Sequence, residues 1–407
     1  MRILKKLLFA IASILLIAII SVALISRVKG VGIRVADGRY LGYSGATSEW
    51  LFLGYPNIPV RRDGPYVLNE GASRFALYIH GDGNMPSKAL KKDVTNEIEV
   101  IVDNAKGTRF IVPLRNSYQR SALNIPSPER LFAISDLEGE FDVMVNLLRA
   151  NHVIDDSLNW SYGAGHLVLI GDMVDRGNNV VPLLWLLYKL EAEAKRAGGN
   201  IHYVLGNHER YLLDGRTKSV APKYYGTYRV SGMSQQELWS ENSELGRWLR
   251  SKPVMIKIGS TLFVHGGVSP MVLNSHSTLQ SIDEEAGKNF FTGDVIRRTV
   301  DGSVIHDATG VIFYRNLAQD MSAHNIGEKA TDKHVTSVLK EFNVDRIAIG
   351  HTLAEHIGSD YEGKVIRVDV DHSAGISEGL LIENDSLWRV DSGGKKFPLE
   401  QVQNLMD

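Results

Sequence analysis

The chain has 407 residues, 44% of them hydrophobic and 23% charged, with a formal charge of −2 and no cysteine. This length accommodates one large domain or two ordinary ones, and the composition is that of a folded globular protein, which excludes a disordered chain, a collagen-like repeat and a disulfide scaffold. The lack of cysteine also excludes thiol catalysis and cysteine-ligated zinc, and the near-zero charge argues against a strongly basic nucleic-acid binder.

The first 30 residues differ from the rest of the chain in charge. They contain five basic side chains and no acidic one, so residues 31–407 keep 40 basic and 47 acidic side chains and a formal charge of −7. Within this leader, residues 7–26 are twenty consecutive uncharged positions. A helix of that length spans about 30 Å, the thickness of the hydrocarbon core of a bilayer.

We expect this segment to be a retained transmembrane helix, with Arg2, Lys5 and Lys6 holding the amino end in the cytoplasm. The alternative is a cleaved signal peptide, with the small residues Ser21 and Ala23 before the cut. Both interpretations place the remainder of the chain outside the cytoplasm, as a membrane-anchored periplasmic protein in the first case and as a secreted one in the second.

Residues 31–125 are rich in glycine, aromatic residues and short alternating runs. Residues 74–80 predict a strand, and residues 98–102 and 108–112 predict a hairpin joined by a five-residue turn. We therefore expect a small all-β accessory domain, which offers no catalytic group and has an unknown partner. The prolines of residues 124–128 predict a linker after it.

From Leu131 onward, short apolar runs alternate with helical patterns at residues 141–150, 180–197 and 331–342. This alternation predicts a layered α/β fold for a catalytic domain at residues 126–395, followed by a tail at 396–407. Folds of this class bind their ligands beyond the carboxyl ends of the strands.

Five of the apolar runs end in polar turns that contain glycine. The runs are residues 131–134, 166–170, 201–205, 262–264 and 346–349, and the polar residues that follow them are Asp136, Asp172, Asp175, Asn207, His208, His265 and His351. Each alone is typical of a helix cap or a turn, but five in order along the chain predict a site at one edge of a sheet. Oxygen and imidazole ligands suit paired divalent metals, and two such ions about 3.5–4 Å apart can bind both the attacking and the leaving oxygen of a displacement at phosphorus.

Four of these turns resemble the motifs of a known family. The four turns have the sequences GDMVDRG at 171–177, GNHE at 206–209, HGG at 265–267 and GHT at 350–352. They resemble motifs of the phosphoprotein phosphatase superfamily of calcineurin-like binuclear metallophosphoesterases. The stretches at 138–155, 245–270 and 312–317 are similar to its Shewanella-like branch. The resemblance covers roughly residues 130–392. It implies a β-sandwich flanked by helices, and an enzyme that hydrolyses phosphomonoesters, with phosphorylated proteins as the expected substrates.

Carried over position by position, the resemblance implies two divalent metal ions. Asp136 and His351 would bind one of them, Asp172 would bridge both, and Asn207 and His265 would complete the second site. Among Mn, Fe, Zn and Mg, we favour manganese.

The resemblance also implies the catalytic groups. His208, oriented by Asp175, would be the general acid that protonates the leaving oxygen, while a hydroxide bridging the two metals attacks phosphorus. Arg176 would bind a phosphoryl oxygen through its bidentate fork, and Arg315 is a weaker candidate for the same role.

The first motif departs from the family at its metal-binding histidine. The family's first motif is Gly-Asp-x-His-Gly, whereas this chain has Ser135-Asp136-Leu137-Glu138-Gly139. Glu138 thus replaces a metal-binding histidine. We expect it to be a ligand, because a carboxylate suits harder ions such as Mn²⁺ or Mg²⁺; the alternative is that Glu138 faces solvent and that the site is impaired.

Two other functions remain open: hydrolysis of dinucleoside polyphosphates or other small phosphates, and a non-catalytic, membrane-tethered binding module with a degenerate metal site. The substrate would be a phosphorylated protein, with serine/threonine or tyrosine left open, or a small phosphate ester, and no nucleic acid is expected. The aromatic side chains of residues 216–242 would either wall the cleft or pack internally. The polar residues Asp369, Asp371 and His372 predict a structural turn.

Overall fold

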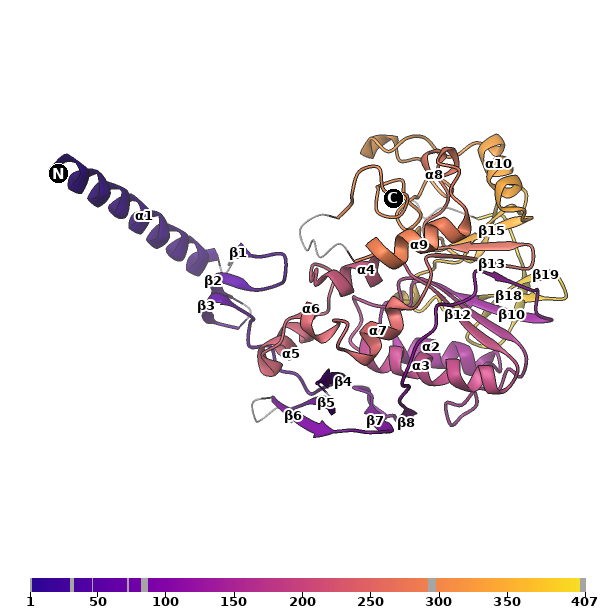
Figure 1. Ribbon diagram of the computed structural model, residues 1–407, viewed down its shortest axis with the longest axis horizontal. Helices are drawn as coiled ribbons and strands as arrows, with labels where there is room; N and C mark the ends of the chain where they lie inside the picture. The colour runs from indigo at the N-terminus through magenta and orange to yellow at the C-terminus, as the bar shows by residue number, and fades with distance from the viewer. Residues whose placement is uncertain are drawn as a thin grey trace.

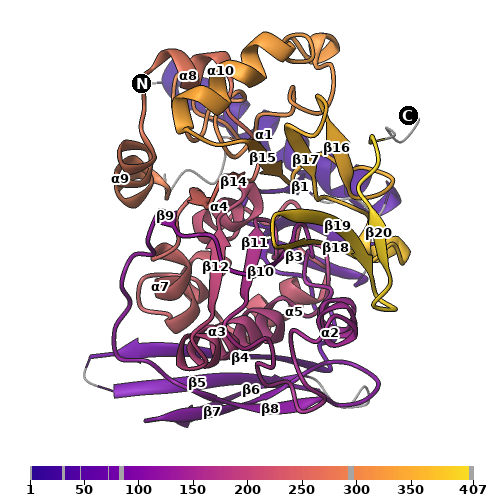
Figure 2. The same cartoon turned by 90° about the vertical axis from the view of Figure 1, so that its right-hand side faces the viewer.

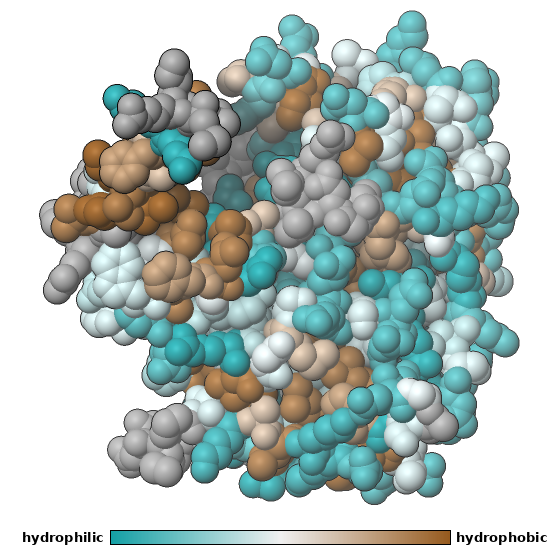
Figure 3. Space-filling model, turned by 60° about the vertical axis from the view of Figure 1, so that its left-hand side comes forward, coloured by the Kyte–Doolittle hydropathy of each residue, from teal (hydrophilic) through white to brown (hydrophobic). Residues whose placement is uncertain are grey.

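A computed structural model of the chain describes residues 2–29, 33–45, 47–71, 73–81, 87–291 and 298–402. Figure 1 shows a layered body from which helix α1 (Arg2–Lys29) extends. A three-stranded sheet lies at the foot of this helix and comprises β1 (Ile33–Arg34), β2 (Tyr40–Ser44) and β3 (Glu49–Gly54). Figure 3 shows apolar side chains gathered on this side of the molecule, and Trp50 and Phe52 of β3 are 42% and 82% exposed.

Residues 7–26, for which a transmembrane helix was predicted, lie within α1. In this helix the structure describes the side chains of residues 5–21 and 24. Over the part of the chain that is described, no helix combines the length and the apolar character needed to cross a membrane. The predicted transmembrane helix is therefore not found.

Two six-stranded sheets form the body. The first has the order β12-β11-β10-β18-β19-β20, and the second has the order β16-β17-β15-β14-β13-β9. The first comprises β10 (Arg130–Ile134), β11 (His166–Ile170), β12 (Asn200–Val204), β18 (Glu378–Glu383), β19 (Ser386–Asp391) and β20 (Lys396–Pro398). The second comprises β9 (Asn124–Ile125), β13 (Met255–Ile258), β14 (Thr261–Val264), β15 (Arg346–Ile349), β16 (Gly358–Asp360) and β17 (Val365–Arg367).

The two sheets face each other across an apolar core. Alternate residues of the strands point into it, for example Ala133 and Val168 from the first sheet and Phe263 and Ala348 from the second. The residues between them, such as Leu167 and Leu169, belong to a second core on the side of the helices. Because both faces are buried, the strands have nearly continuous apolar sequences. The predicted sandwich with flanking helices is confirmed.

Helices cover the outer faces and the edges of the sheets. They are α2 (Phe141–Ala150), α3 (Val180–Arg196), α4 (Asn207–Asp214), α5 (Lys223–Ser231), α6 (Gln235–Leu238), α7 (Glu244–Arg250), α8 (Pro270–Asn274), α9 (Leu279–Asn289) and α10 (Asp332–Phe342), with 3₁₀ turns at Ser322–His324 (η1) and His372–Ala374 (η2). Helices α2, α3 and α10 agree with the three helical patterns predicted from the sequence.

The strands before residue 126 confirm the predicted hairpin but not a separate core. Strands β7 (Glu97–Ile101) and β8 (Arg109–Pro113) pair antiparallel, with Ile98 opposite Val112. These strands and β4 (Arg62–Glu70) lie along helix α3 (Figure 2), and Trp185 Nε1 donates to Pro65 O at 2.8 Å. Strands β5 (Ser73–His80) and β6 (Lys88–Asp93) continue the sheet from β4 and contact α5. Their apolar residues belong to the same core as those of α3. The domain boundary near residue 125 stays a prediction.

Candidate active site

The site forms where parallel strands of both sheets end. In the first sheet β10, β11 and β12 are parallel, with Ile134 opposite Leu169 and Ile170 opposite Val204. In the second sheet β14, β15 and β17 are parallel, with Val264 opposite Ile349. The predicted polar residues follow these strands. They converge from two facing sheets and not from the single sheet edge predicted, because strand pairing between distant segments is not encoded in local patterns.

The turns that carry the acidic residues have strained backbone conformations. Asp136, Asp172, Asp175, Arg176 and His351 have φ angles of 52°, 55°, 74°, 49° and 65°. Non-glycine residues adopt this left-handed region at a cost and cluster in it at functional sites. At Gly206 and Gly350 an added Cβ would collide with the carboxylates of Asp172 and Asp136. The backbone thus approaches these carboxylates closely.

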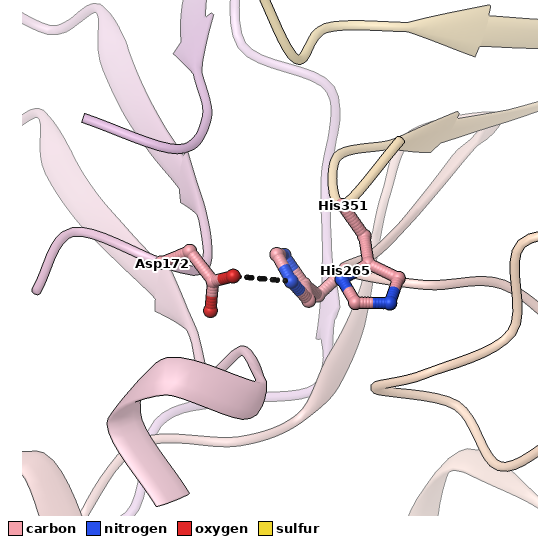
Figure 4. Close-up of side chains that lie close together, drawn as sticks. All are labelled: Asp172, His265 and His351. Carbon is pink, nitrogen blue, oxygen red and sulfur yellow. Dashed lines mark ion pairs between the residues drawn. The ribbon is translucent and has the colours of Figure 1, made fainter. Parts of the chain in front are cut away.

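One metal-binding cluster is evident from the side chains. Ligand atoms of Asp172, His265 and His351, all buried, lie within 4.8 Å of one another (Figure 4). His265 Nε2 is 3.0 Å from Asp172 Oδ2 and 3.1 Å from Asn207 Oδ1. Two imidazoles, a carboxylate and an amide oxygen fit a borderline divalent ion. The structure groups His351 with His265 here, whereas the sequence interpretation assigned it to the metal of Asp136.

Charges of opposite sign surround this cluster. Burial raises the pKa of Asp172, but the neighbouring His265 and His208 lower it by more, so that its pKa is lower than usual. Against the effect of burial, Asp172 and Asp136 raise the pKa of His265 to about 10. Metal binding at this cluster must therefore displace a proton from His265, because a coordinating imidazole nitrogen is unprotonated.

Asp136 and Glu138 line a cavity that is also lined by Asp172 and His351. Asp136 Oδ2 accepts bonds from Ser135 Oγ and from His351 N. Burial raises the pKa of Asp136 to about 6 and that of Glu138 to about 7. The Glu138 carboxylate forms an ion pair with Arg176. Glu138 therefore faces the site and not open solvent, although whether it binds metal stays a prediction.

His208 and Asp175 form the predicted acid pair. His208 Nδ1 is 2.7 Å from Asp175 Oδ2, and both side chains are buried. Burial lowers the pKa of His208, but Asp172 and Asp175 outweigh this effect and raise it to about 9. Since Nδ1 is used by Asp175, Nε2 is the nitrogen that remains to donate a proton.

Two arginines reach the cavity in different ways. The Arg176 side chain is 60% exposed, so an incoming anion can approach it. Arg315 donates to the carbonyl oxygen of His351, and burial lowers its pKa. Arg315 thus holds the His351 turn in addition to facing the cavity.

Sequence reasoning missed Glu209, which organises the turns of the first sheet. It accepts hydrogen bonds from the backbone nitrogens of Asp172, Met173 and Gly206 at 2.7–2.9 Å, and from Tyr203 Oη at 2.8 Å. Glu209 is fully buried. Its place in the GNHE motif was the only sequence feature that could have pointed to this role. A buried carboxylate needs several hydrogen-bond donors, and the backbone nitrogens of these turns provide them.

The cavity has a volume of about 490 Å³. Six carboxyl groups and two guanidinium groups line it; the acidic residues are Asp136, Glu138, Glu140, Asp172, Asp369 and Asp371, and the basic ones are Arg176 and Arg315. This excess of negative charge would repel a phosphate ester unless cations were bound. Asp369, Asp371 and His372 were predicted to be a structural turn, yet they line this cavity. The feature that could have indicated this is their position after β17, which is a third parallel strand of the second sheet.

The aromatic side chains of residues 216–242 pack internally and do not wall the cleft. Tyr224, Tyr225, Tyr228 and Trp239 are 1–5% exposed. Tyr224 Oη accepts from Val180 N at 3.1 Å, and Tyr228 Oη donates to Gln235 Oε1 at 2.6 Å. None of the four lines the cavity described above.

Comparison with known proteins agrees with this geometry. The family model for calcineurin-like phosphoesterases matches residues 129–355. The chain therefore belongs to the calcineurin-like phosphoesterase family and is a metallophosphatase, a hydrolase of phosphoric esters. Its relatives include Shewanella-like protein phosphatase 2 of Arabidopsis thaliana, which is 25% identical over 72% of this chain and 84% of the relative.

A solved structure resembles the chain over a longer part. The cold-active protein-tyrosine phosphatase of a psychrophilic Shewanella species is 29% identical, with a TM-score of 0.74 over 84% of this chain and 100% of that protein. The matched 84% of the chain is longer than the segment that follows residue 129. The similarity therefore extends into the strands that precede the catalytic motifs. Symmetrical bis(5'-nucleosyl)-tetraphosphatase of Neisseria meningitidis is 28% identical, over only 34% of this chain.

Proposed function

We propose that this chain is a metal-dependent phosphomonoesterase that dephosphorylates proteins, with phosphotyrosine among its substrates. The observation that carries the proposal is the His208–Asp175 pair, 2.7 Å apart, beside the cluster of Asp172, His265 and His351 in an acidic cavity. The Shewanella protein-tyrosine phosphatase supports the choice of tyrosine, because it is similar along its whole length.

The residues of the site have separate roles in metal binding, phosphate binding and proton transfer. Asp172, Asn207, His265 and His351 would hold one divalent cation, and Asp136, Glu138 and Asp172 the other. When bound, the cations would supply Lewis-acid catalysis, activating water and neutralising the phosphoryl charge. Arg176 would bind phosphoryl oxygens through its exposed guanidinium, for which it must leave Glu138. His208 would donate the proton on Nε2 to the leaving oxygen.

A substrate panel tests this function. The full-length chain, loaded in turn with Mn²⁺, Mg²⁺ and Zn²⁺, is assayed on matched phosphotyrosine, phosphoserine and phosphothreonine peptides and on a dinucleoside tetraphosphate. We expect the highest kcat/KM on phosphotyrosine peptide with Mn²⁺, and no turnover after treatment with a chelator. A higher kcat/KM on the dinucleotide would contradict the proposal and favour the small-phosphate hydrolase.

The cellular location is part of the same proposal: the catalytic part lies outside the cytoplasm, exported by the leader at residues 1–30, which is then either retained or cleaved. The basic, acid-free leader before a body of charge −7 supports it. Attachment of a reporter enzyme that is active only outside the cytoplasm tests this location, and amino-terminal sequencing of the mature protein distinguishes an anchor from a cleaved leader. A reporter that stays inactive when fused to the carboxyl end would contradict export.

A further inference from the structure

Asp369 lies beside the metal-binding residues because strands β15 and β17 are neighbours and run parallel. In the parallel pair of β15 and β17, Ile349 is opposite Arg367. His351 and Asp369 follow the ends of these two strands. Backbone bonds continue between the two segments, from Val368 N to Ile349 O at 2.8 Å and from Ala354 N to Asp369 O at 2.9 Å, and Ala354 is opposite Val370. The backbone thus holds Asp369 beside the turn at residues 350–354 that contains His351.

The Asp369 carboxyl group is buried and forms no hydrogen bond or ion pair with a described residue, although Arg315 and Arg367 are close enough for their charges to act on it. It lines the cavity and is 6% exposed. The other buried carboxylates of the cavity are occupied: Asp136 by Ser135 and His351, Asp172 by His208 and His265, and Glu138 by Arg176. Among the residues that the structure describes, no hydrogen bond or ion pair reaches the side chain of Asp369. A buried, unpaired carboxylate is costly unless a cation or donor compensates it.

The same wall contains a second polar group without a partner. His372 is 2% exposed and lines the cavity, and neither of its ring nitrogens makes a hydrogen bond of good geometry in the described structure, although the Ser135 backbone is close enough to act on its pKa. Burial lowers its pKa to about 4, so the imidazole is neutral near pH 7 and offers no charge to balance Asp369. Buried polar groups without partners point to a ligand that belongs at this wall.

We propose that Asp369 is a direct ligand of the metal ion on the side of Asp136 and Glu138. This inference rests on the metal dependence in the proposed function, and it goes beyond the ligands that the sequence motifs indicate. With Asp136, Glu138, Asp172 and Asp369, which all line the cavity, that position would have four carboxylate ligands and no nitrogen ligand. Such a donor set selects a hard cation, Mg²⁺ or Mn²⁺, over Zn²⁺. The neighbouring position, with His265, His351 and Asn207, is the one suited to a softer ion.

Metal binding is measured directly, without substrate. The metal-free, full-length chain is titrated with Mn²⁺ by calorimetry, and the bound ion is counted by electron paramagnetic resonance and elemental analysis. We expect two sites in the natural chain. In Asp369→Asn and Asp369→Ala, one site should weaken at least about tenfold, in line with the effect of removing groups around a metal, while the other keeps its affinity.

Asp371→Asn is the matched control. Asp371 lines the same cavity, but its Oδ1 accepts from Ser373 Oγ at 2.7 Å and from Ala374 N at 2.9 Å. Asparagine preserves that acceptor, so both sites should keep their affinity for Mn²⁺. Unchanged Mn²⁺ affinity at both sites in Asp369→Asn and Asp369→Ala would overturn the proposal.

Thermal unfolding separates a ligand from a structural carboxylate. If Asp369 is a ligand, the metal-free Asp369→Asn variant should be at least as stable as the natural chain, because an amide of the same size replaces a buried carboxyl group that has no hydrogen-bond partner, and Mn²⁺ should raise its Tm less. A loss of Tm in the metal-free variant, with unchanged Mn²⁺ affinity, would make Asp369 structural.

These outcomes are independent of catalysis. A chain that binds two Mn²⁺ ions, loses one affinity in Asp369→Asn and yet hydrolyses no phosphoester would contradict the proposed function and leave this inference intact. The converse result, activity on phosphopeptides with unaltered metal binding in both Asp369 variants, would overturn the inference alone.

Discussion

Glu138 occupies the position at which the sequence resemblance predicts a metal-binding histidine, and its ion pair with Arg176 links two roles. The Glu138 carboxylate either neutralises Arg176 or contributes to a metal site, since one ion pair and one coordination bond compete for the same oxygens. Binding of a cation near Asp136 and Glu138 would therefore release Arg176 for the phosphoryl group. Burial already raises the pKa of Glu138 to about 7, a shift that a bound cation would reverse.

We predict that Glu138→Gln loses one of two bound metal ions and most of its activity. The amide keeps the size of the side chain but removes the charge that a hard cation requires. Elemental analysis of the purified variant gives the metal content. Glu140→Gln is the control, because Glu140 also lines the cavity; full metal occupancy in Glu138→Gln would show that Glu138 is not a ligand.

We predict that Asp175→Asn shifts the pH dependence of kcat. The Asp175 carboxylate helps to raise the pKa of His208 to about 9, and a general acid is active only while protonated. Loss of the negative charge lowers this pKa, so the fall of kcat on the alkaline side should move to lower pH. His208→Asn should lose that limb altogether, with a decrease in kcat on the order of 10²–10⁴. A uniform loss of kcat with an unmoved profile would contradict the assigned role of Asp175.

Among the elements, strands and helices were easier to predict than their arrangement. Helix α2 and strands β10 and β11 follow from local apolar periodicity and from the polar turns that end them. Their division between two sheets depends on contacts between distant segments, which no local pattern encodes. Strand β17 has only three residues, too few for a recognisable period. The place of Asp369 and His372 in the cavity was missed for that reason.

The segment after β8 is attached to the helices through Glu191 of α3. Its carboxylate accepts bonds from Arg115, from Lys252 and, at 2.8 Å, from Trp248 Nε1. Burial raises the pKa of Glu191, but Lys252 and Arg115 outweigh this effect and lower it from 4.5 to about 2. Since the pKa is lower in the folded state, the network stabilises the fold above pH 4.5 and is lost as the pH falls toward 2.

We predict that Glu191→Gln destabilises the fold by about 3–5 kcal/mol near pH 7, because Lys252 remains buried and unpaired. The natural chain should lose up to roughly 3 kcal/mol from this group between pH 4.5 and 2, a decline absent from the variant. Urea denaturation at several pH values measures both effects. In the control Glu99→Gln, the broken pair with Arg109 is exposed and should cost less than about 1 kcal/mol. Parallel pH profiles of Glu191→Gln and the natural chain would contradict the assignment.

At the scale of the whole molecule, the strands before residue 126 behave as part of the catalytic body. Val67 and Ala76 of the β4–β5 hairpin and Trp185 of α3 lie in one core, and each is at most 2% exposed. Removal of these strands would expose that side of α3, and burial of a large apolar side chain contributes about 1.5–3 kcal/mol. The composition of residues 31–125 could not reveal this, because alternation of apolar and polar residues identifies a half-buried strand but not the surface that covers it.

We therefore predict one cooperative unfolding transition for residues 33–402, and no stable fold for a fragment that begins at residue 124. Several core side chains would lose their partners in the fragment, and their summed loss exceeds the stability of about 5–15 kcal/mol that is typical of a domain. Calorimetry and near-ultraviolet circular dichroism measure this, with metal added to both proteins so that ligand stabilisation is equal. The matched control begins at residue 33 and removes only α1, which extends from the body (Figure 1); its Tm should match that of the full chain. A fragment from residue 124 that unfolds cooperatively at the same Tm and binds two Mn²⁺ ions would instead establish residues 31–125 as the separate accessory domain that their composition suggests.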